Sequence, residues 1–107
     1  MSERSALFRK KLEGNPENHL FRFSLSQALF EEGSLAECID ELENCLAAKP
    51  EWMIASLLLG KAKKEAGRTE EAAVVFEETV RMAREQNHEG PEEEARALLT
   101  ECRESKQ

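Results

Sequence analysis

Residues 25–43 read LSQALFEEGSLAECIDELE, and residues 59–77 read LGKAKKEAGRTEEAAVVFE. Six residues of the first stretch recur 34 positions later in the second, as Leu25 and Leu59, Ala28 and Ala62, Glu31 and Glu65, Gly33 and Gly67, Glu37 and Glu71, and Glu43 and Glu77. A pattern duplicated at this period is typical of stacked helix–turn–helix units. The alternative is a four-helix bundle, which has no reason to repeat its turns and packing positions at one period. The sequence therefore favours an all-α repeat architecture.

Apolar spacing and helix-boundary residues predict about six helices in antiparallel pairs. We expect them at about residues 2–13, 17–32, 35–48, 52–66, 69–86 and 91–104. Gly33 and Gly67 fall at the two short turns, where a positive φ is needed to reverse the chain. Ser34 and Glu37 have the spacing of a capping box at the start of a helix.

The two units resemble tetratricopeptide repeats, whose pattern is W-x2-L-G-x2-Y, then A-x3-F, then P. The residues at these slots are Arg22, Leu25, Ser26, Leu29, Cys38, Leu42 and Pro50 in the first unit, and Ser56, Leu59, Gly60, Lys63, Ala72, Phe76 and Arg84 in the second. Both aromatic slots of the first helix depart from the family in each unit. The Leu, small-residue and large-apolar slots agree in type.

The resemblance implies an α-α superhelix that forms one domain over residues 1–107. Its parts would be an N-terminal capping helix at 1–14, repeats at 19–52 and 53–86, and a C-terminal capping helix at 91–105. One face of the first helix of each unit has the spacing of a packing surface. That face is formed by Phe21, Leu25, Ala28 and Leu29 in the first unit, and by Ala55, Leu59, Ala62 and Ala66 in the second.

The opposite face of the same two helices is the candidate binding site. It carries Leu20, Phe23, Gln27 and Phe30 in the first unit, and Ile54, Leu57, Lys61 and Lys64 in the second. The resemblance implies that this face lines a concave groove that binds a peptide or a partner helix, so that the protein acts as a scaffold. An exposed apolar patch is usually an interaction site. The alternatives are a homodimer built on the same patch, and coverage of the face by a terminal segment of the chain.

The charge of the chain limits the classes of partner. The formal net charge is -7, which repels phosphate backbones and anionic lipid, so we expect neither nucleic acid nor a membrane as a partner. A local basic cluster stands against this acidic background at Lys61, Lys63, Lys64 and Arg68. It would either steer an acidic peptide toward the apolar face or solvate a helix end.

Nothing in the sequence predicts an enzyme, a cofactor or a metal site. It contains no catalytic triad pattern, no glycine-rich phosphate loop and no HExxH motif. Cys38, Cys45 and Cys102 lie at small-residue positions of helices and are expected to be free, buried thiols. We see no signal peptide or membrane-spanning segment and expect a cytoplasmic protein. Trp52 is expected either at the seam between the units or at the rim of the groove.

Overall fold

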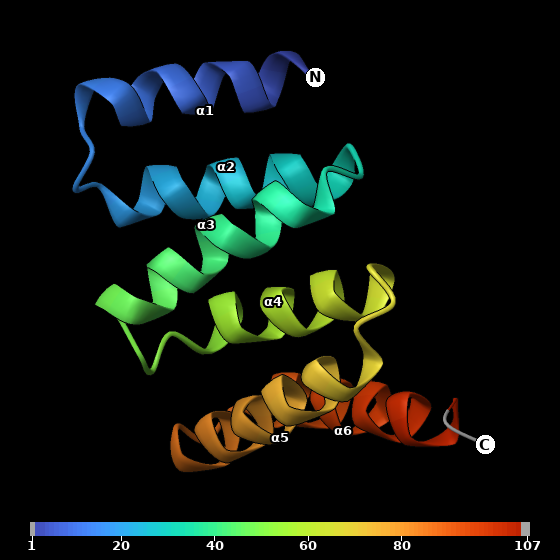
Figure 1. Cartoon of the computed structure of the whole chain (residues 1–107). Helices are drawn as coiled ribbons and strands as arrows, with labels where there is room; N and C mark the ends of the chain where they lie inside the picture. The colour runs from blue at the N-terminus through green and yellow to red at the C-terminus, as the bar shows by residue number, and fades with distance from the viewer. Residues whose placement is uncertain (1, 106–107) are drawn as a thin grey trace.

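The computed structural model describes residues 2–105, and within that range it contains six α-helices and no strand (Figure 1). The helices are α1 (Glu3–Gly14), α2 (His19–Glu31), α3 (Leu35–Ala48), α4 (Met53–Glu65), α5 (Thr69–Glu85) and α6 (Glu89–Glu104). Each bound lies within about two residues of the one that periodicity and boundary residues predict. The predicted all-α class is confirmed.

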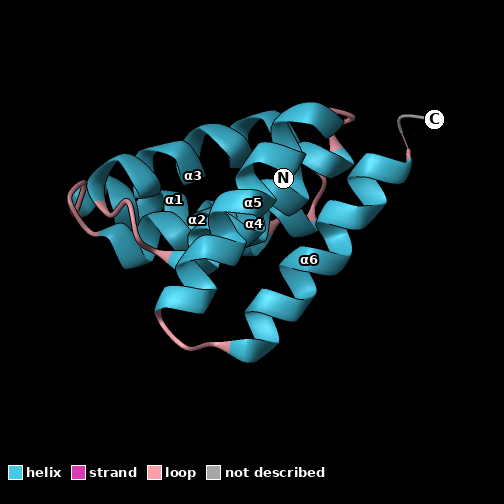
Figure 2. Ribbon diagram, turned by 90° about the horizontal axis from the view of Figure 1, so that it is seen from below, coloured by secondary structure: helices cyan, strands magenta, loops and turns pink. Residues whose placement is uncertain are grey.

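The helices stack as antiparallel neighbours along one long axis. The hairpins α2–α3 and α4–α5 form the middle of the stack, α1 packs on α2, and α6 packs on α5 (Figure 1). The fold measures 42 × 29 × 20 Å, and α1 and α6 lie at its two ends. Figure 2 shows α3 along one side of the molecule and α6 along the other. The proposed division into repeats at 19–52 and 53–86, between caps at 1–14 and 91–105, stays a prediction.

The turns within the two hairpins have the same backbone geometry. Gly33 and Gly67 adopt φ angles of 82° and 81°, as the sequence predicts. The N–H after each glycine donates to the carbonyl four residues before that glycine, at 2.9 and 2.8 Å. This pattern closes a helix by satisfying one of its last free carbonyls. The turn between α5 and α6 uses Asn87 instead, with a φ of 61°.

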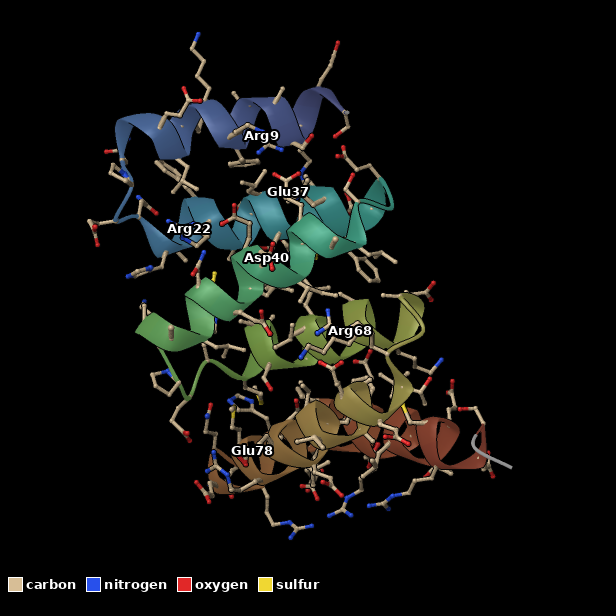
Figure 3. The ribbon with its side chains drawn as sticks, in the orientation of Figure 1. Arg9, Arg22, Glu37, Asp40, Arg68 and Glu78 are labelled. Carbon is tan, nitrogen blue, oxygen red and sulfur yellow. The ribbon has the colours of Figure 1, made fainter. Side chains whose placement is uncertain are left out.

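The predicted capping box at the start of α3 is wrong. Ser34 makes no side-chain cap, and its hydroxyl donates instead to the carboxylate of Glu32 at 3.0 Å. Glu37 accepts a hydrogen bond from the guanidinium of Arg9 on α1, and Figure 3 shows these two side chains pointing toward one another. A full positive charge from a neighbouring helix is a stronger partner for the carboxylate than a neutral backbone N–H.

The core follows the stack in two main clusters of buried side chains. The first contains Leu12, Leu25, Leu29, Cys38, Ile39, Leu42, Cys45, Ala55, Leu59 and Ala62, and the second contains Leu57, Ala72, Phe76, Val80, Ala95, Leu99 and Cys102. The predicted packing faces of α2 and α4 are therefore confirmed in their central positions. Phe21 is half-buried, and Ala66 is exposed because α4 ends one residue before it.

None of the helices within residues 2–105 is both long enough and apolar enough to cross a membrane. The longest of them, α5, carries glutamates and arginines along its length. A cytoplasmic location stays a prediction.

Candidate functional site

Helix α2 carries the apolar half of the predicted binding face. Leu20, Phe23, Gln27 and Phe30 follow one another at helical spacing and share one side of the helix. Leu20 is 65% exposed and projects from the surface. Phe23 and Phe30 are half-buried against the first core cluster, and Gln27 is half-buried beside them. We call Leu20, Phe23 and Phe30 the α2 patch.

The turn between α3 and α4 places an aromatic ring against this patch. The Trp52 N–H donates to the Lys49 carbonyl at 3.1 Å, which folds the turn back toward α2. The rings of Trp52 and Phe23 then lie 5.1 Å apart between centroids, within the range of a favourable aromatic pair. Trp52 therefore packs at the seam between the hairpins, one of the two positions considered from the sequence, and its ring contacts the α2 patch. A place at the rim of a binding groove stays a prediction.

A shallow hollow opens beside Trp52. Its volume is about 300 Å³, and it is lined by Leu20, Lys49, Glu51 and Trp52. The ammonium of Lys49 lies 5.2 Å from the centroid of the Trp52 ring, a cation–π distance. We call this feature the Trp52 hollow. It joins an exposed leucine, an aromatic wall, the positive charge of Lys49 and the negative charge of Glu51 at one place on the surface.

The second unit presents a different surface at the matching positions. Ile54 is 43% exposed, so it can extend the apolar surface of the α2 patch. Leu57 is only 6% exposed and belongs to the second core cluster with Phe76 and Leu99. The expectation that Leu57 lines an open groove is wrong, because Leu99 on α6 packs against the same cluster and the side chain is buried within the chain.

Lys61 and Lys64 of the predicted binding face reach α6 through ion pairs. The ammonium of Lys61 lies 2.5 Å from a carboxylate oxygen of Glu94, and that of Lys64 lies 3.2 Å from one of Glu101. The two lysine side chains are about one-third exposed and their glutamate partners about half exposed, so each pair is partly shielded from water. The pairs hold α6 against α4 on this side of the second hairpin.

The other two members of the basic cluster are also paired within the chain. Lys63 is buried and lies 3.4 Å from Glu43 and 3.1 Å from Glu71. Arg68 lies 2.6 Å from Glu71, and hydrogen bonds from Arg68 and Lys63 lower the pKa of that carboxyl to about 2. All four cations of the cluster thus have acidic partners inside the molecule. This favours a structural role for the cluster over the steering of an acidic ligand.

The cysteines are free and buried, as the sequence predicts. Burial raises the pKa of the Cys38 thiol to about 12 and that of Cys45 to about 11. Burial also raises the pKa of Cys102. Because the thiolate is the reactive form, these side chains are poor nucleophiles at neutral pH. Within residues 2–105 no group of three or more His, Cys, Asp or Glu could hold a metal ion.

Lys49 is the residue of the Trp52 hollow to which the sequence did not point. It lies in a turn and has no neighbour in sequence that marks it as part of a binding face. Its position depends on how the α3–α4 turn folds back onto α2, which is a tertiary feature. The only signal was Trp52 itself, a large aromatic residue at the start of a repeat unit.

Neither a protein-family model nor a curated protein matches the sequence. Solved structures do match the fold. A tetratricopeptide repeat domain protein from Salinibacter ruber superposes with a TM-score of 0.74 at 18% identity, covering 81% of this chain and 97% of that one. The chain has a tetratricopeptide-repeat fold. A protein from Bordetella parapertussis, known from a solution structure, matches with a TM-score of 0.85 at 20% identity, over 98% of this chain and 91% of its own.

A mutant of MamA shares the tetratricopeptide-like arrangement over 95% of this chain and 62% of its own, with a TM-score of 0.65 at 21% identity. At these identities the comparison establishes the fold and not the ligand. In the tetratricopeptide-like stack, α2 and α4 are the first helices of the two central hairpins. Leu20, the exposed residue of the α2 patch, therefore lies on the first helix of the first hairpin.

Proposed function

We propose that this protein is a non-catalytic interaction module that binds a peptide or a partner helix on the surface formed by α2 and the start of α4. The observation that carries the proposal is the exposure of Leu20 beside the Trp52 hollow. Binding sites are typically concave, mainly apolar, and supplied with a few polar groups that fix orientation. The Trp52 hollow combines an exposed leucine and an aromatic ring with two charged groups, those of Lys49 and Glu51.

The proposed site is narrower than the face that the sequence suggests. It comprises Leu20, Phe23, Gln27, Phe30 and Ile54, whose side chains are exposed or half-buried. A ligand side chain would pack against the α2 patch and Ile54, while the rest of the segment follows the groove. Leu57, Lys61 and Lys64 are assigned to the scaffold, because they pack against or pair with α6.

The tetratricopeptide-repeat fold supports a protein partner, because the family resemblance implies binding of a peptide or a partner helix. A second copy of the chain is the alternative partner, and it would use the same exposed surface around Leu20 and Ile54. Light scattering across a dilution series separates the two cases. A mass that stays at one chain removes the homodimer, whereas a mass that falls on dilution supports it.

An unbiased peptide selection on the wild-type protein tests the proposal. The peptides that emerge are then measured against two variants of matched exposure, Leu20→Ser at the site and Val74→Ser on α5. Leu20 is 65% exposed and Val74 is 60% exposed, so both substitutions should leave the fold intact. We expect Leu20→Ser to weaken binding about tenfold, as for loss of one apolar anchor, and Val74→Ser to leave it unchanged.

The outcome that contradicts the proposal is equal binding of the selected peptides to both variants. A thermal melt of each variant accompanies the binding measurement, and unchanged melting shows that any loss of affinity is local. Failure to select any peptide, together with a monomeric mass at all concentrations, would also count against an interaction role for this surface.

A further inference from the structure

The shape of the Trp52 hollow depends on the turn between α3 and α4. Lys49, Glu51 and Trp52 of its lining come from this turn, and Leu20 comes from α2. On the side of α2, the turn is held by the contact between the rings of Trp52 and Phe23. A displacement of the turn would therefore move most of the lining at once.

Helix α5 binds the same turn at two points. Arg81 donates to both carboxylate oxygens of Glu51, at 2.9 and 3.3 Å. The side-chain amide of Gln86, at the end of α5, donates to the backbone carbonyl of Glu51 at 3.1 Å. The turn and the end of α5 lie at the same edge of the molecule (Figure 1). The side chain and the main chain of Glu51 are thus both held from the second unit.

A buried contact lies beside these hydrogen bonds. Met53, the first residue of α4, packs with Met82 and Ala83 of α5 in a small apolar cluster. Met82 follows Arg81 in the sequence, so this packing brings the guanidinium to the turn. A single exposed ion pair contributes little to a structure, whereas a bidentate pair in a network can hold a geometry. Here the bidentate pair is joined by the amide of Gln86 and by the buried methionines.

Arg81 is shared with two further carboxylates, and both belong to its own helix. Glu78 and Glu85 lie about one turn before and after Arg81 on α5, each at 2.9 Å. They orient the guanidinium along the helix, whereas Glu51 connects it to the turn. The hydrogen bond from Arg81 lowers the pKa of Glu51, and the hydrogen bond to Glu51 is the first of the causes that raise the pKa of Arg81.

The sequence explains why only the second unit can hold a turn in this way. Arg81 lies 34 residues after Ala47, whose methyl group offers no charge to a turn. Pro50 follows the end of α3, whereas Arg84 takes the corresponding position in the second unit. Because a proline disfavours helix at itself and at the preceding residue, α3 ends after 14 residues while α5 continues to 17. The longer helix carries Gln86 to the turn.

This inference rests on the proposed function and adds two residues that control its site. We propose that Arg81 and Gln86 are positioning residues, which hold the α3–α4 turn so that the Trp52 ring forms the wall of the hollow beside Leu20. Neither of these two side chains lines the hollow, so they act on a bound peptide through Glu51 and the turn. The second unit thereby sets the shape of the site that the first unit presents.

The fluorescence of Trp52 reports the position of the turn without any peptide, because it is the only tryptophan of the chain. The double variant Arg81→Gln/Gln86→Ala removes both links from α5. We expect its emission to move to longer wavelength and acrylamide to quench it more strongly, because the ring loses its fixed place against Phe23. Acrylamide is uncharged, so the loss of an arginine does not alter its approach.

Arg103→Gln is the control variant for this measurement. Arg103 also joins two elements through one carboxylate, since it lies on α6 and donates to Glu77 of α5 at 2.9 Å. Neither residue lines the Trp52 hollow or contacts the α3–α4 turn in an ion pair. We expect the emission and quenching of Arg103→Gln to equal those of the wild type.

A matched pair of glutamate variants shows which partner of Arg81 matters. Glu51→Gln and Glu78→Gln each remove one carboxylate from the guanidinium, but only Glu51→Gln weakens the link to the turn. We expect the emission of Trp52 to shift in Glu51→Gln and to stay at the wild-type value in Glu78→Gln. Adding Arg81→Gln to Glu51→Gln should then have little further effect, because the two positions act as a pair.

Peptides from the unbiased selection test whether the position of the turn matters for binding. We expect the double variant to bind them about fivefold more weakly by calorimetry, as for loss of a networked surface pair, and Arg103→Gln to bind as the wild type does. Circular dichroism at the temperature of the titration shows that each variant is folded. A purely structural role of Arg81 would lower the melting temperature and leave the emission and the affinity unchanged.

Two results would overturn the inference: emission and quenching of the double variant equal to those of Arg103→Gln, or unchanged peptide affinity in a double variant whose emission has shifted. Both results leave the proposed function in place if Leu20→Ser still weakens the selected peptides. Loss of that dependence on Leu20, with a shifted emission in the free double variant, would overturn the proposed function and support the positioning of the turn by α5.

Discussion

The hairpins α2–α3 and α4–α5 turn in the same way but differ in how their interiors are filled. Gly33 and Gly67 have φ angles within a degree of each other, at 82° and 81°. About two helical turns from the glycine, however, the pair Ser26 and Leu42 of the first unit is replaced by Gly60 and Phe76 in the second. The repeat thus preserves the backbone reversal and allows the packing residues to change.

The change at Gly60 and Phe76 is concerted. A Cβ atom added to Gly60 would lie 2.4 Å from a ring carbon of Phe76, which is too close for any side chain without movement of the ring. The large ring is therefore tolerated in the second hairpin because the facing residue has no side chain. When the two units are compared, residues that pack against each other must therefore be treated as a pair and not one position at a time.

The two units also differ in what covers their outer slots. Leu20 of the first unit lines an open hollow, and Phe23 is half-buried against the Trp52 ring. Leu57, at the position that corresponds to Phe23, is instead buried with Leu99 of α6. The same slot in a repeat is accordingly a surface position in one unit and a core position in the next. This difference is the reason for proposing that the first unit binds the ligand and the second supports the fold.

The largest expected effect on stability distinguishes Leu57 from Leu20, two leucines that the sequence predicts on the same binding face. Leu57→Ala should lower the free energy of unfolding by about 2–5 kcal/mol, as for a buried leucine. Leu20→Ala makes the same chemical change at an exposed position and should cost within about 0.5 kcal/mol. Urea denaturation of both variants measures these free energies of unfolding. Similar losses for the two variants would refute the contrast between an exposed position in the first unit and a buried one in the second.

The next effect tests the concerted pair inside the second hairpin. Gly60→Ser should cost about 1–3 kcal/mol, because the new side chain collides with the ring of Phe76. Adding Phe76→Leu, which completes the pair found in the first unit, should recover part of that loss. Gly90→Ser is the control, since no atom lies within 4 Å of a Cβ at that position. Additive costs in the double variant would show that the two positions are independent.

A smaller effect is expected where the hairpins are alike. Gly67→Val should lower stability by about 1–2 kcal/mol, because a branched side chain disfavours positive φ. Gly67→Asn should cost less, since Asn87 already adopts a φ of 61° in the α5–α6 turn. Nothing lies within 4 Å of a Cβ at Gly67, so crowding does not contribute. Melting temperatures that rank asparagine below valine would contradict the backbone explanation.

The smallest effect concerns pH and the ion pairs around Glu71. The pKa of Glu71 falls from 4.5 to about 2 in the folded protein, chiefly through hydrogen bonds from Arg68 and then Lys63. A lowered carboxyl pKa stabilises the fold above the unfolded pKa, and this contribution is lost as the pH falls through the folded value. The stability difference between wild type and Glu71→Gln should therefore be constant above about pH 5 and shrink toward pH 2.

Denaturation at several pH values measures this difference, with the exposed Glu65→Gln as the control variant. Glu71 is about half exposed, so solvent screening keeps its contribution small. A difference that grows toward low pH would have the wrong sign and would contradict the assignment of the ion pairs.

Local signals were sufficient for the helices and their turns. The recurrence of Gly33 at Gly67, and the apolar spacing on either side, depend only on residues close in sequence. The predictions that were wrong depend on contacts between segments that are distant in sequence. Glu37 pairs with Arg9 of α1 rather than capping its own helix, and Leu57 is buried partly by α6. Lys49 was missed for the same reason, because the α3–α4 turn carries it to the Trp52 hollow.

A map of amide chemical shifts with a bound peptide, taken from the unbiased selection, is the most direct test of the central claim that the first unit binds and the second supports. The account predicts that the largest shifts occur at Leu20, Phe23 and the indole of Trp52. Signals from Val74 and from the outer face of α6 should remain in place. Shifts centred on α5 and α6, with those of Leu20 and Trp52 unchanged, would contradict the account.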